Sequence, residues 1–372
     1  MKKRMFLGVL IFSLAGVMGW TQRYIPSPYW FTLERGKFFF RNGDYGDALM
    51  SFEDARRERR GMYTRMEQDL ITVLSIPEVR RFGDSLDRIE TYISERYHVE
   101  AAAALEELYY RVPKAHLENS ATRALGELGR LKEYPEAEYW IGETYRVEGE
   151  LGVALGQYQK AYEQRMFLEN PGFDVEILYK IVDILKVRQE YAEMERQAVE
   201  ILAEDSLWFQ DSGVLTRNAM ARVLENEGIN RFLTLYRYNN AVVERAHRLL
   251  GFYYYASGRY GRAAEHLEFA FLIQNTILLE EIIRNQYDFT FTTMNALIQE
   301  VMRRSVLAGY IEDVEYYKTI YYLGAALYGD GKLVPARLFW TFLSGRPEAG
   351  EWNGRAQSQL KSPFVEKVQE MP

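Results

Sequence analysis

Few side chains in this sequence could perform catalysis or hold a metal ion. The 372-residue chain has no cysteine and four histidines: His98, His116, His247 and His266. Glu244 and His247 stand three residues apart, as do Glu95 and His98, and such pairs bind metal when two of them face each other. The sequence contains no metalloprotease, serine-hydrolase or phosphate-loop motif. We therefore predict a protein without catalytic activity, cofactor or metal site.

One pattern occurs four times and defines the elements on which a site must be built. A glycine is followed by an aromatic residue or leucine three positions on, a second glycine at seven, a bulky residue at nine and an alanine at twelve. The copies are Gly36, Phe39, Gly43, Tyr45 and Ala48; Gly142, Tyr145, Gly149, Leu151 and Ala154; Gly251, Tyr254, Gly258, Tyr260 and Ala263; and Gly324, Leu327, Gly331, Leu333 and Ala336. A recurring unit of this kind predicts stacked helix pairs.

Each position of the pattern has a packing role. The first glycine lets two antiparallel helices approach closely, and the second ends a helix, because glycine adopts left-handed backbone angles at little cost. The alanine is a further close contact. A large residue follows four positions later in each copy: Phe52, Tyr158, Leu267 and Trp340. Small and large residues at this interval indicate a helix–turn–helix unit that buries its apolar face only by stacking on its neighbours.

At these residues the chain resembles the tetratricopeptide repeat (TPR) family, and specifically its exported bacterial members. The resemblance implies an all-α fold, a right-handed superhelical solenoid of about nine helix pairs over residues 29–360. The first glycines lie 106, 109 and 73 residues apart, which leaves room for degenerate units between the clear copies at a period of about 36. We assign such units to Asp174–Leu202, Leu215–Tyr236 and Thr290–Tyr316, and a terminal capping helix to Glu351–Leu360. Residues 361–372 form a C-terminal tail.

The N-terminus predicts export. Lys2, Lys3 and Arg4 precede an uncharged run from Met5 to Trp20, which is the form of a secretory signal. The run of sixteen residues is short for a spanning helix, which usually needs about 20. Residues 1–21 are thus a signal peptide or an N-terminal membrane anchor, with a short linker at 22–28. Both alternatives predict a periplasmic protein, tethered to the inner membrane if the segment is uncleaved.

Composition narrows the class of partner. The net charge is −7, and the single dense basic cluster is Arg56–Arg60. A nucleic-acid-binding protein would need a broad basic face, so we predict no nucleic-acid partner.

In a solenoid each repeat touches only its neighbours, so the two Glu–His pairs should not meet. The family register places His247 and His266 on paired helices, where they could be neighbours.

The resemblance also implies a partner-binding surface, because first-helix positions line the concave groove in the family. Carried over to this chain, the groove residues are Lys37, Phe40, Tyr139, Arg146, Arg248, Phe252, Tyr255, Lys318, Tyr321 and Tyr328. Aromatic residues and arginine are the types that protein interfaces favour. The lysine–asparagine set with which some family members clamp a C-terminal carboxylate is not evident here.

Two functions remain open at this stage. The first is a non-enzymatic protein–protein interaction scaffold in the bacterial cell envelope, such as part of a membrane-associated or flagellar-motor assembly; spirochaete flagellar collar components are one example. The alternative is a periplasmic transport-accessory protein that binds a small molecule or peptide. The stretch Gln274–Tyr310 motivates the alternative, because it departs from the repeat and insertions in solenoids often lie on the binding face. Self-association is compatible with both.

Overall fold

The computed structural model describes residues 28–368 apart from 75–76, 96, 112–127, 129–130, 204, 206–207 and 209–210. Within that part of the chain the structure is all-helical, with no strand. It divides into two compact units at Pro171 and Gly172, called here the N-terminal and C-terminal units, and each is described by itself. The predicted signal or anchor, residues 1–21, lies outside the described residues. None of the helices formed by the described residues is long and apolar enough to cross a membrane.

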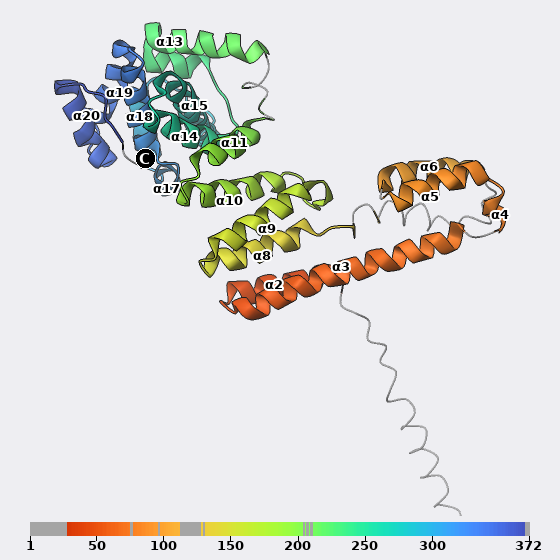
Figure 1. Cartoon of the computed structure of the whole chain (residues 1–372). Helices are drawn as coiled ribbons and strands as arrows, with labels where there is room; N and C mark the ends of the chain where they lie inside the picture. The colour runs from red at the N-terminus through yellow and green to blue at the C-terminus, as the bar shows by residue number, and fades with distance from the viewer. Residues whose placement is uncertain are drawn as a thin grey trace, which may run out of the picture. The chain divides into compact units, whose positions relative to one another are not determined.

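In the N-terminal unit, helices that follow one another along the chain pack as pairs (Figure 1). The elements are α2 (Tyr29–Arg41), α3 (Tyr45–Leu74), α4 (Pro77–Arg80), α5 (Gly83–Ser94), α6 (His98–Arg111), α8 (Pro135–Val147), α9 (Leu151–Glu163) and the short η1 (Arg165–Phe167). The α2–α3, α5–α6 and α8–α9 pairs pack internally, and α3 also packs on α8.

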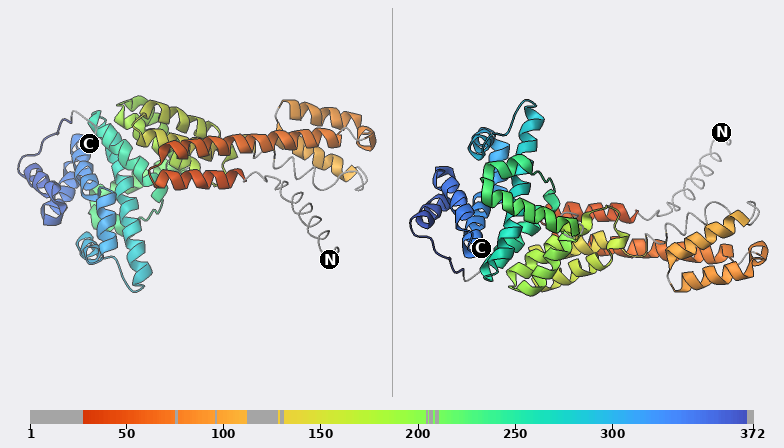
Figure 2. Two further views of the ribbon diagram at one scale, coloured as in Figure 1. Left: turned by 90° about the horizontal axis from the view of Figure 1, so that it is seen from below. Right: turned by 90° about the horizontal axis from the view of Figure 1, so that it is seen from above.

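The C-terminal unit repeats this arrangement with more elements. They are α10 (Phe173–Val187), α11 (Tyr191–Leu202), α13 (Asp211–Leu235), α14 (Ala241–Ala256), α15 (Tyr260–Asn285), α16 (Met294–Met302), α17 (Ser305–Asp313), α18 (Tyr316–Gly329), α19 (Leu333–Ser344), η2 (Pro347–Ala349) and α20 (Glu351–Lys361). The α10–α11, α14–α15 and α18–α19 pairs pack internally, α15 packs on α18, and α20 closes the series against α19 (Figure 2).

The four copies of the sequence pattern coincide with four helix pairs, which confirms the prediction of helices packed in neighbouring pairs. A Cβ atom added to Gly36 would lie 2.5 Å from the Phe52 ring, and one on Gly251 would lie 2.5 Å from Leu267. Gly142 and Gly324 are equally crowded, by Tyr158 and Trp340. Since no real Cβ fits at such distances, each first glycine is where its partner helix comes closest. The pattern alanines are Ala48, Ala154, Ala263 and Ala336, and all are fully buried.

The turn between the paired helices needs a left-handed residue. The second glycine of the first two copies has a φ of +84° at Gly43 and +86° at Gly149, and the other two copies agree. The degenerate unit predicted at Asp174–Leu202 is the α10–α11 pair, and there Gln189 takes this position with a φ of 59°. Gln189 stands two residues before Tyr191, as Gly43 does before Tyr45. The geometry of the turn is therefore kept where the glycine is lost.

Two predicted segments differ in the structure. Leu215–Tyr236 lies mostly in α13, which is broken at Gly228 by non-helical angles of φ 80° and ψ 178°. The predicted departure from the repeat over Gln274–Tyr310 does not begin at Gln274, because α15 continues as a regular helix to Asn285. Two polar side chains of this stretch are buried and bond to the helix backbone: Asn275 Nδ2 donates to the Phe271 carbonyl at 2.7 Å, and the Thr276 hydroxyl donates to the Leu272 carbonyl at 2.8 Å.

Candidate functional site

Three of the groove residues predicted in the N-terminal unit gather around Trp140, on α8. The Lys37 Nζ atom lies 5.6 Å from the centre of the Trp140 ring, and the Phe40 ring lies 5.5 Å from it. Tyr139 is buried, with its ring 5.5 Å from that of Trp140. Trp140 is not a signature position of the repeat, so the pattern gave no reason to select it.

The two predicted cations of this unit are paired within their own helices. Lys37 donates a hydrogen bond to Glu34 at 2.6 Å. Arg146 donates to both carboxylate oxygens of Glu143, at 3.2 and 2.9 Å. The Tyr158 hydroxyl donates to the same carboxylate. These contacts join neighbouring side chains of the unit, and they include no segment from outside the helix pairs.

In the C-terminal unit, the predicted cations Arg248 and Lys318 share one carboxylate. Arg248 Nη1 donates to Glu315, and Lys318 Nζ donates to the other oxygen of that group at 2.6 Å. Arg248 Nε also donates to Glu244 at 3.1 Å. The Lys318 ammonium lies 4.9 Å from the centre of the buried Phe252 ring. Helices α14 and α18 are thus linked along their predicted groove positions by ion pairs and a cation–π contact.

Next to these cations lies an aromatic cluster built from three helices. Tyr255 of α14 packs on Tyr322 of α18 with ring centres 5.0 Å apart. Tyr321 packs on Trp352 of α20 at 5.4 Å. The Arg355 guanidinium, one turn after Trp352, lies 4.5 Å from the Tyr321 ring centre and 4.6 Å from that of Trp352. The Arg355 guanidinium is therefore held between these two aromatic rings.

The segment that follows α20 lies against this aromatic cluster and Arg355. It runs back from the end of α20 to α14 and α18 (Figure 2). The Tyr255 hydroxyl donates to the Glu366 carbonyl at 3.1 Å, and the Tyr321 hydroxyl to the Glu366 carboxylate at 2.9 Å. The Tyr328 hydroxyl donates to the Pro363 carbonyl at 3.2 Å. Three predicted groove tyrosines thus bind one extended segment of the chain itself.

Arg355 completes the grip on this segment. Its Nη2 atom lies 2.5 and 2.6 Å from the two carboxylate oxygens of Glu366. Gln359 accepts from the backbone N–H of Phe364 at 3.0 Å and donates to the Tyr321 hydroxyl at 3.3 Å. We call residues 362–368 the C-terminal tail, and Tyr255, Tyr321, Tyr328 and Arg355 the tail site. Two backbone carbonyls and one carboxylate are recognised there by four side chains.

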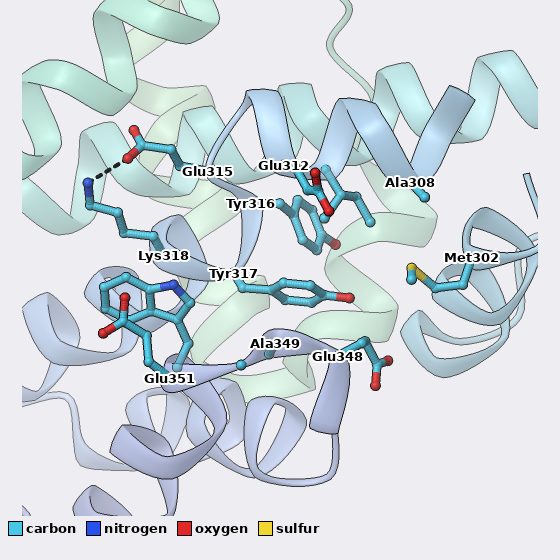
Figure 3. A pocket seen from close by; sticks show the side chains of 13 residues that line it. Met302, Ala308, Glu312, Glu315, Tyr316, Tyr317, Lys318, Glu348, Ala349 and Glu351 are labelled. Carbon is cyan, nitrogen blue, oxygen red and sulfur yellow. Dashed lines mark hydrogen bonds and ion pairs between the residues drawn. The ribbon is translucent and has the colours of Figure 1, made fainter. Parts of the chain in front are cut away.

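A cavity of about 540 Å³ adjoins the tail site (Figure 3), because Trp352, which lines the cavity, packs on Tyr321. Four glutamates line it, together with Lys318, Met302, Ala308 and the rings of Tyr316 and Tyr317: Glu312, Glu315, Glu348 and Glu351. The ion pair of Lys318 with Glu315 lies at one end (Figure 3). Because carboxylates outnumber the one ammonium group, the cavity favours a cationic side chain over an anionic one.

The histidines form a pair, as the repeat register allowed. The Nδ1 atoms of His247 and His266 lie 3.1 Å apart, and His247 Nε2 lies 3.6 Å from the Asp205 carboxylate. Burial lowers the pKa of both imidazoles, that of His266 well below its ordinary value. Glu244 binds Arg248 and Gln274 instead of the histidines. No group of three metal-ligating side chains occurs among the residues that the structure describes.

A second cavity, of about 320 Å³, lies among α13, α15 and the turn between α18 and α19. Glu268 of α15 lines it and is buried. Within the described residues, its Oε1 atom has no hydrogen-bond partner. Burial raises the pKa of Glu268 to about 8, so this carboxyl group carries its proton at neutral pH. Three other charged groups of the lining bind one another: Lys332 Nζ lies 2.9 Å from the Glu225 carboxylate and 3.3 Å from that of Asp330.

The comparisons with known proteins reach most of the chain without assigning an activity. No protein-family model and no solved structure matches. An uncharacterized protein of Treponema pallidum is 22% identical over 333 residues, which is 89% of this chain and 89% of the relative. An uncharacterized protein of Borreliella burgdorferi is 20% identical over 252 residues, 62% of this chain and 78% of the relative. The first similarity extends over both units, so the chain as a whole has a counterpart.

Proposed function

We propose that this chain is an exported TPR-like protein of the bacterial cell envelope that binds other proteins and performs no catalysis. The proposal includes the right-handed solenoid implied by the family resemblance. It is supported by the four copies of the pattern, each with its crowded first glycine and its left-handed turn. Such repeats stack without forming a deep active site and present extended surfaces to partners.

The observation that carries the binding function is the tail site. Side chains at predicted groove positions hold an extended segment through its carbonyl groups and one carboxylate. This is the chemistry by which a helical groove takes an extended peptide: backbone contacts give affinity, and a charged group gives specificity. The aromatic rings of the tail site and the adjoining glutamate-lined cavity add contact types that protein interfaces favour.

The setting of this function is a periplasmic assembly. Three cations followed by an uncharged run at the N-terminus support export. Both relatives come from spirochaetes, which supports a role in an envelope structure of these bacteria. We place the chain as a scaffold of a membrane-associated assembly, with the flagellar motor as the specific candidate.

Crosslinking in native cells tests the proposal. A C-terminal tag would sit beside the tail, so the epitope belongs in the turn at Tyr287, a residue that is 93% exposed. Mass spectrometry of the captured material should find a short, reproducible set of envelope or motor proteins. Capture of the chain alone, at the same expression level, would contradict the scaffold function.

A second candidate function is the binding of a small molecule or peptide for transport. It is favoured by one observation: Met302 and Ala308, from the stretch that departs from the repeat, line the cavity of about 540 Å³. Native mass spectrometry of the protein purified from its own cells distinguishes the two. A bound small molecule of constant mass supports transport, whereas its absence together with captured proteins supports the scaffold.

A further inference from the structure

The tail site has the composition of a binding site for a separate peptide. Its hydrogen bonds are made to backbone carbonyls and to one carboxylate of the tail. Phe364 is 53% exposed and Val365 is 39% exposed. A segment that served only to complete the core would bury such residues. The tail instead lies on the surface, held by a few polar contacts.

These contacts are of a kind that a competing segment can replace. The side chains of Arg355 and Glu366 are 28% and 27% exposed, so water reaches this ion pair and a carboxylate from another segment can take the place of Glu366. The tail keeps its place mainly through its tether, which raises its local concentration to the order of millimolar. A partner with better contacts can therefore displace it.

We propose that the C-terminal tail is a built-in competitor for the tail site, and that the partner of the scaffold presents an extended segment with a glutamate or aspartate in the place of Glu366. This inference rests on the proposed protein-binding function and names the chemistry of the partner. The adjoining glutamate-lined cavity repels further acidic residues and attracts a basic one. The displacing segment thus combines an acidic residue, for Arg355, with a nearby basic residue, for the cavity.

A peptide that copies the tail tests the site directly. A labelled peptide of residues 361–372 is titrated against three full-length proteins: the native chain, Glu366→Gln, and Lys367→Gln as the control of equal charge magnitude. For a tail and a peptide that each bind with a Kd of ~100 μM, a tethered tail at an effective concentration of about 1 mM raises the apparent Kd of the peptide roughly tenfold. We expect the Glu366→Gln protein to bind the peptide about tenfold more tightly than the native and Lys367→Gln proteins, whose own tails still compete.

A second set of titrations changes the peptide and its contact residue Arg355. A Glu366→Gln peptide should lose most of its binding to the Glu366→Gln protein, and so should the native peptide when Arg355→Gln is added to that protein. Equal affinity for the native and Glu366→Gln proteins, or equal binding of the two peptides, would overturn the proposal. A chain ending at Lys361 serves as a check that needs no substitution: it should bind the peptide as Glu366→Gln does.

The same variants separate this inference from the proposed function. Crosslinking in cells is repeated with native and Glu366→Gln chains at equal expression. More captured envelope protein with Glu366→Gln supports competition by the tail. Equal, substantial capture overturns the inference and leaves the scaffold function standing. No captured protein, together with the expected peptide titrations, leaves the tail site standing and contradicts the scaffold.

Discussion

The two units of this protein follow one repeat pattern but use their groove positions in different ways. In the N-terminal unit, Lys37 and Arg146 are each paired with a glutamate three residues earlier in the same helix. In the C-terminal unit, Tyr255, Tyr321 and Tyr328 bind a segment that lies outside the repeats. Local ion pairs therefore hold the groove cations of both units. Among the described groove residues, those of the C-terminal unit differ because three of their tyrosines also hold a ligand-like segment.

Under the proposed function, this difference indicates which elements determine the binding site. The pattern of small and large residues fixes where paired helices approach each other, and it does so alike in both units. At the proposed binding site an element outside the pattern also contributes, namely α20 with Trp352 and Arg355. Function is therefore expected to follow the capping helix and the tail more than the repeats.

The largest effect should come from overpacking the pattern, and it should be similar in the two units. Ala154 and Ala263 are both fully buried, so Ala154→Leu and Ala263→Leu should each lower the free energy of unfolding by about 1–3 kcal/mol. Ala192→Leu, at an exposed position of α11, is the control and should change little. Urea unfolding measures all three. Unchanged stability in both buried variants would contradict the shared packing.

The next effect should be confined to the C-terminal unit and should depend on pH. Between the unfolded pKa of Glu268, about 4.5, and its folded value of about 8, only the folded state carries the proton, so this group lowers stability as pH rises. Glu268→Gln should therefore raise the free energy of unfolding at pH 8 by at least about 1 kcal/mol, since each unit of pKa difference corresponds to about 1.4 kcal/mol, and have little effect at pH 4.5. Glu312→Gln, at an exposed position, is the control. An equal gain in stability at pH 8 and at pH 4.5 would contradict the raised pKa of Glu268.

The N-terminal unit offers a matched pair of glycines for a smaller effect of opposite sign. A Cβ on Gly142 would lie 2.8 Å from the Tyr158 ring, whereas one on Gly156 would meet nothing within 4 Å. Gly142→Ala should destabilise by about 1 kcal/mol or more, while Gly156→Ala should stabilise by up to about 1 kcal/mol because alanine favours the helix. Thermal unfolding distinguishes them, and a gain in both would show that the close approach is not required.

The smallest effect tests the degenerate α10–α11 turn. Gln189 has a φ of 59°, which costs a residue with a side chain more than it costs glycine. Gln189→Gly should stabilise by about 0.5 kcal/mol, since the greater freedom of glycine in the unfolded state offsets part of the gain. Arg188→Gly, in the helical region with a φ of −81°, should destabilise instead. The same sign in both variants would contradict a turn shared with the other copies.

The sequence predicted the repeated elements well because the interactions behind them are local. Gly251 and Leu267 meet across a turn of fixed length, so their spacing was enough to place them. The tail site was only half predictable: its tyrosines lay at groove positions that the family resemblance implied, but Glu366 reaches them from a segment without a pattern. One signal was available, since Trp352 and Arg355 stand three residues apart and share a face of α20.

The most direct test of the account is site-specific photo-crosslinking in native cells from two tyrosine positions. The crosslinking residue replaces Tyr328, in the tail site, or Tyr287, on an exposed turn, in chains with and without Glu366→Gln. We predict that position 328 captures a discrete envelope protein, more strongly with Glu366→Gln, and that position 287 does not. The same products from both positions, or none from position 328 in either background, would contradict a scaffold that binds its partner at the tail site.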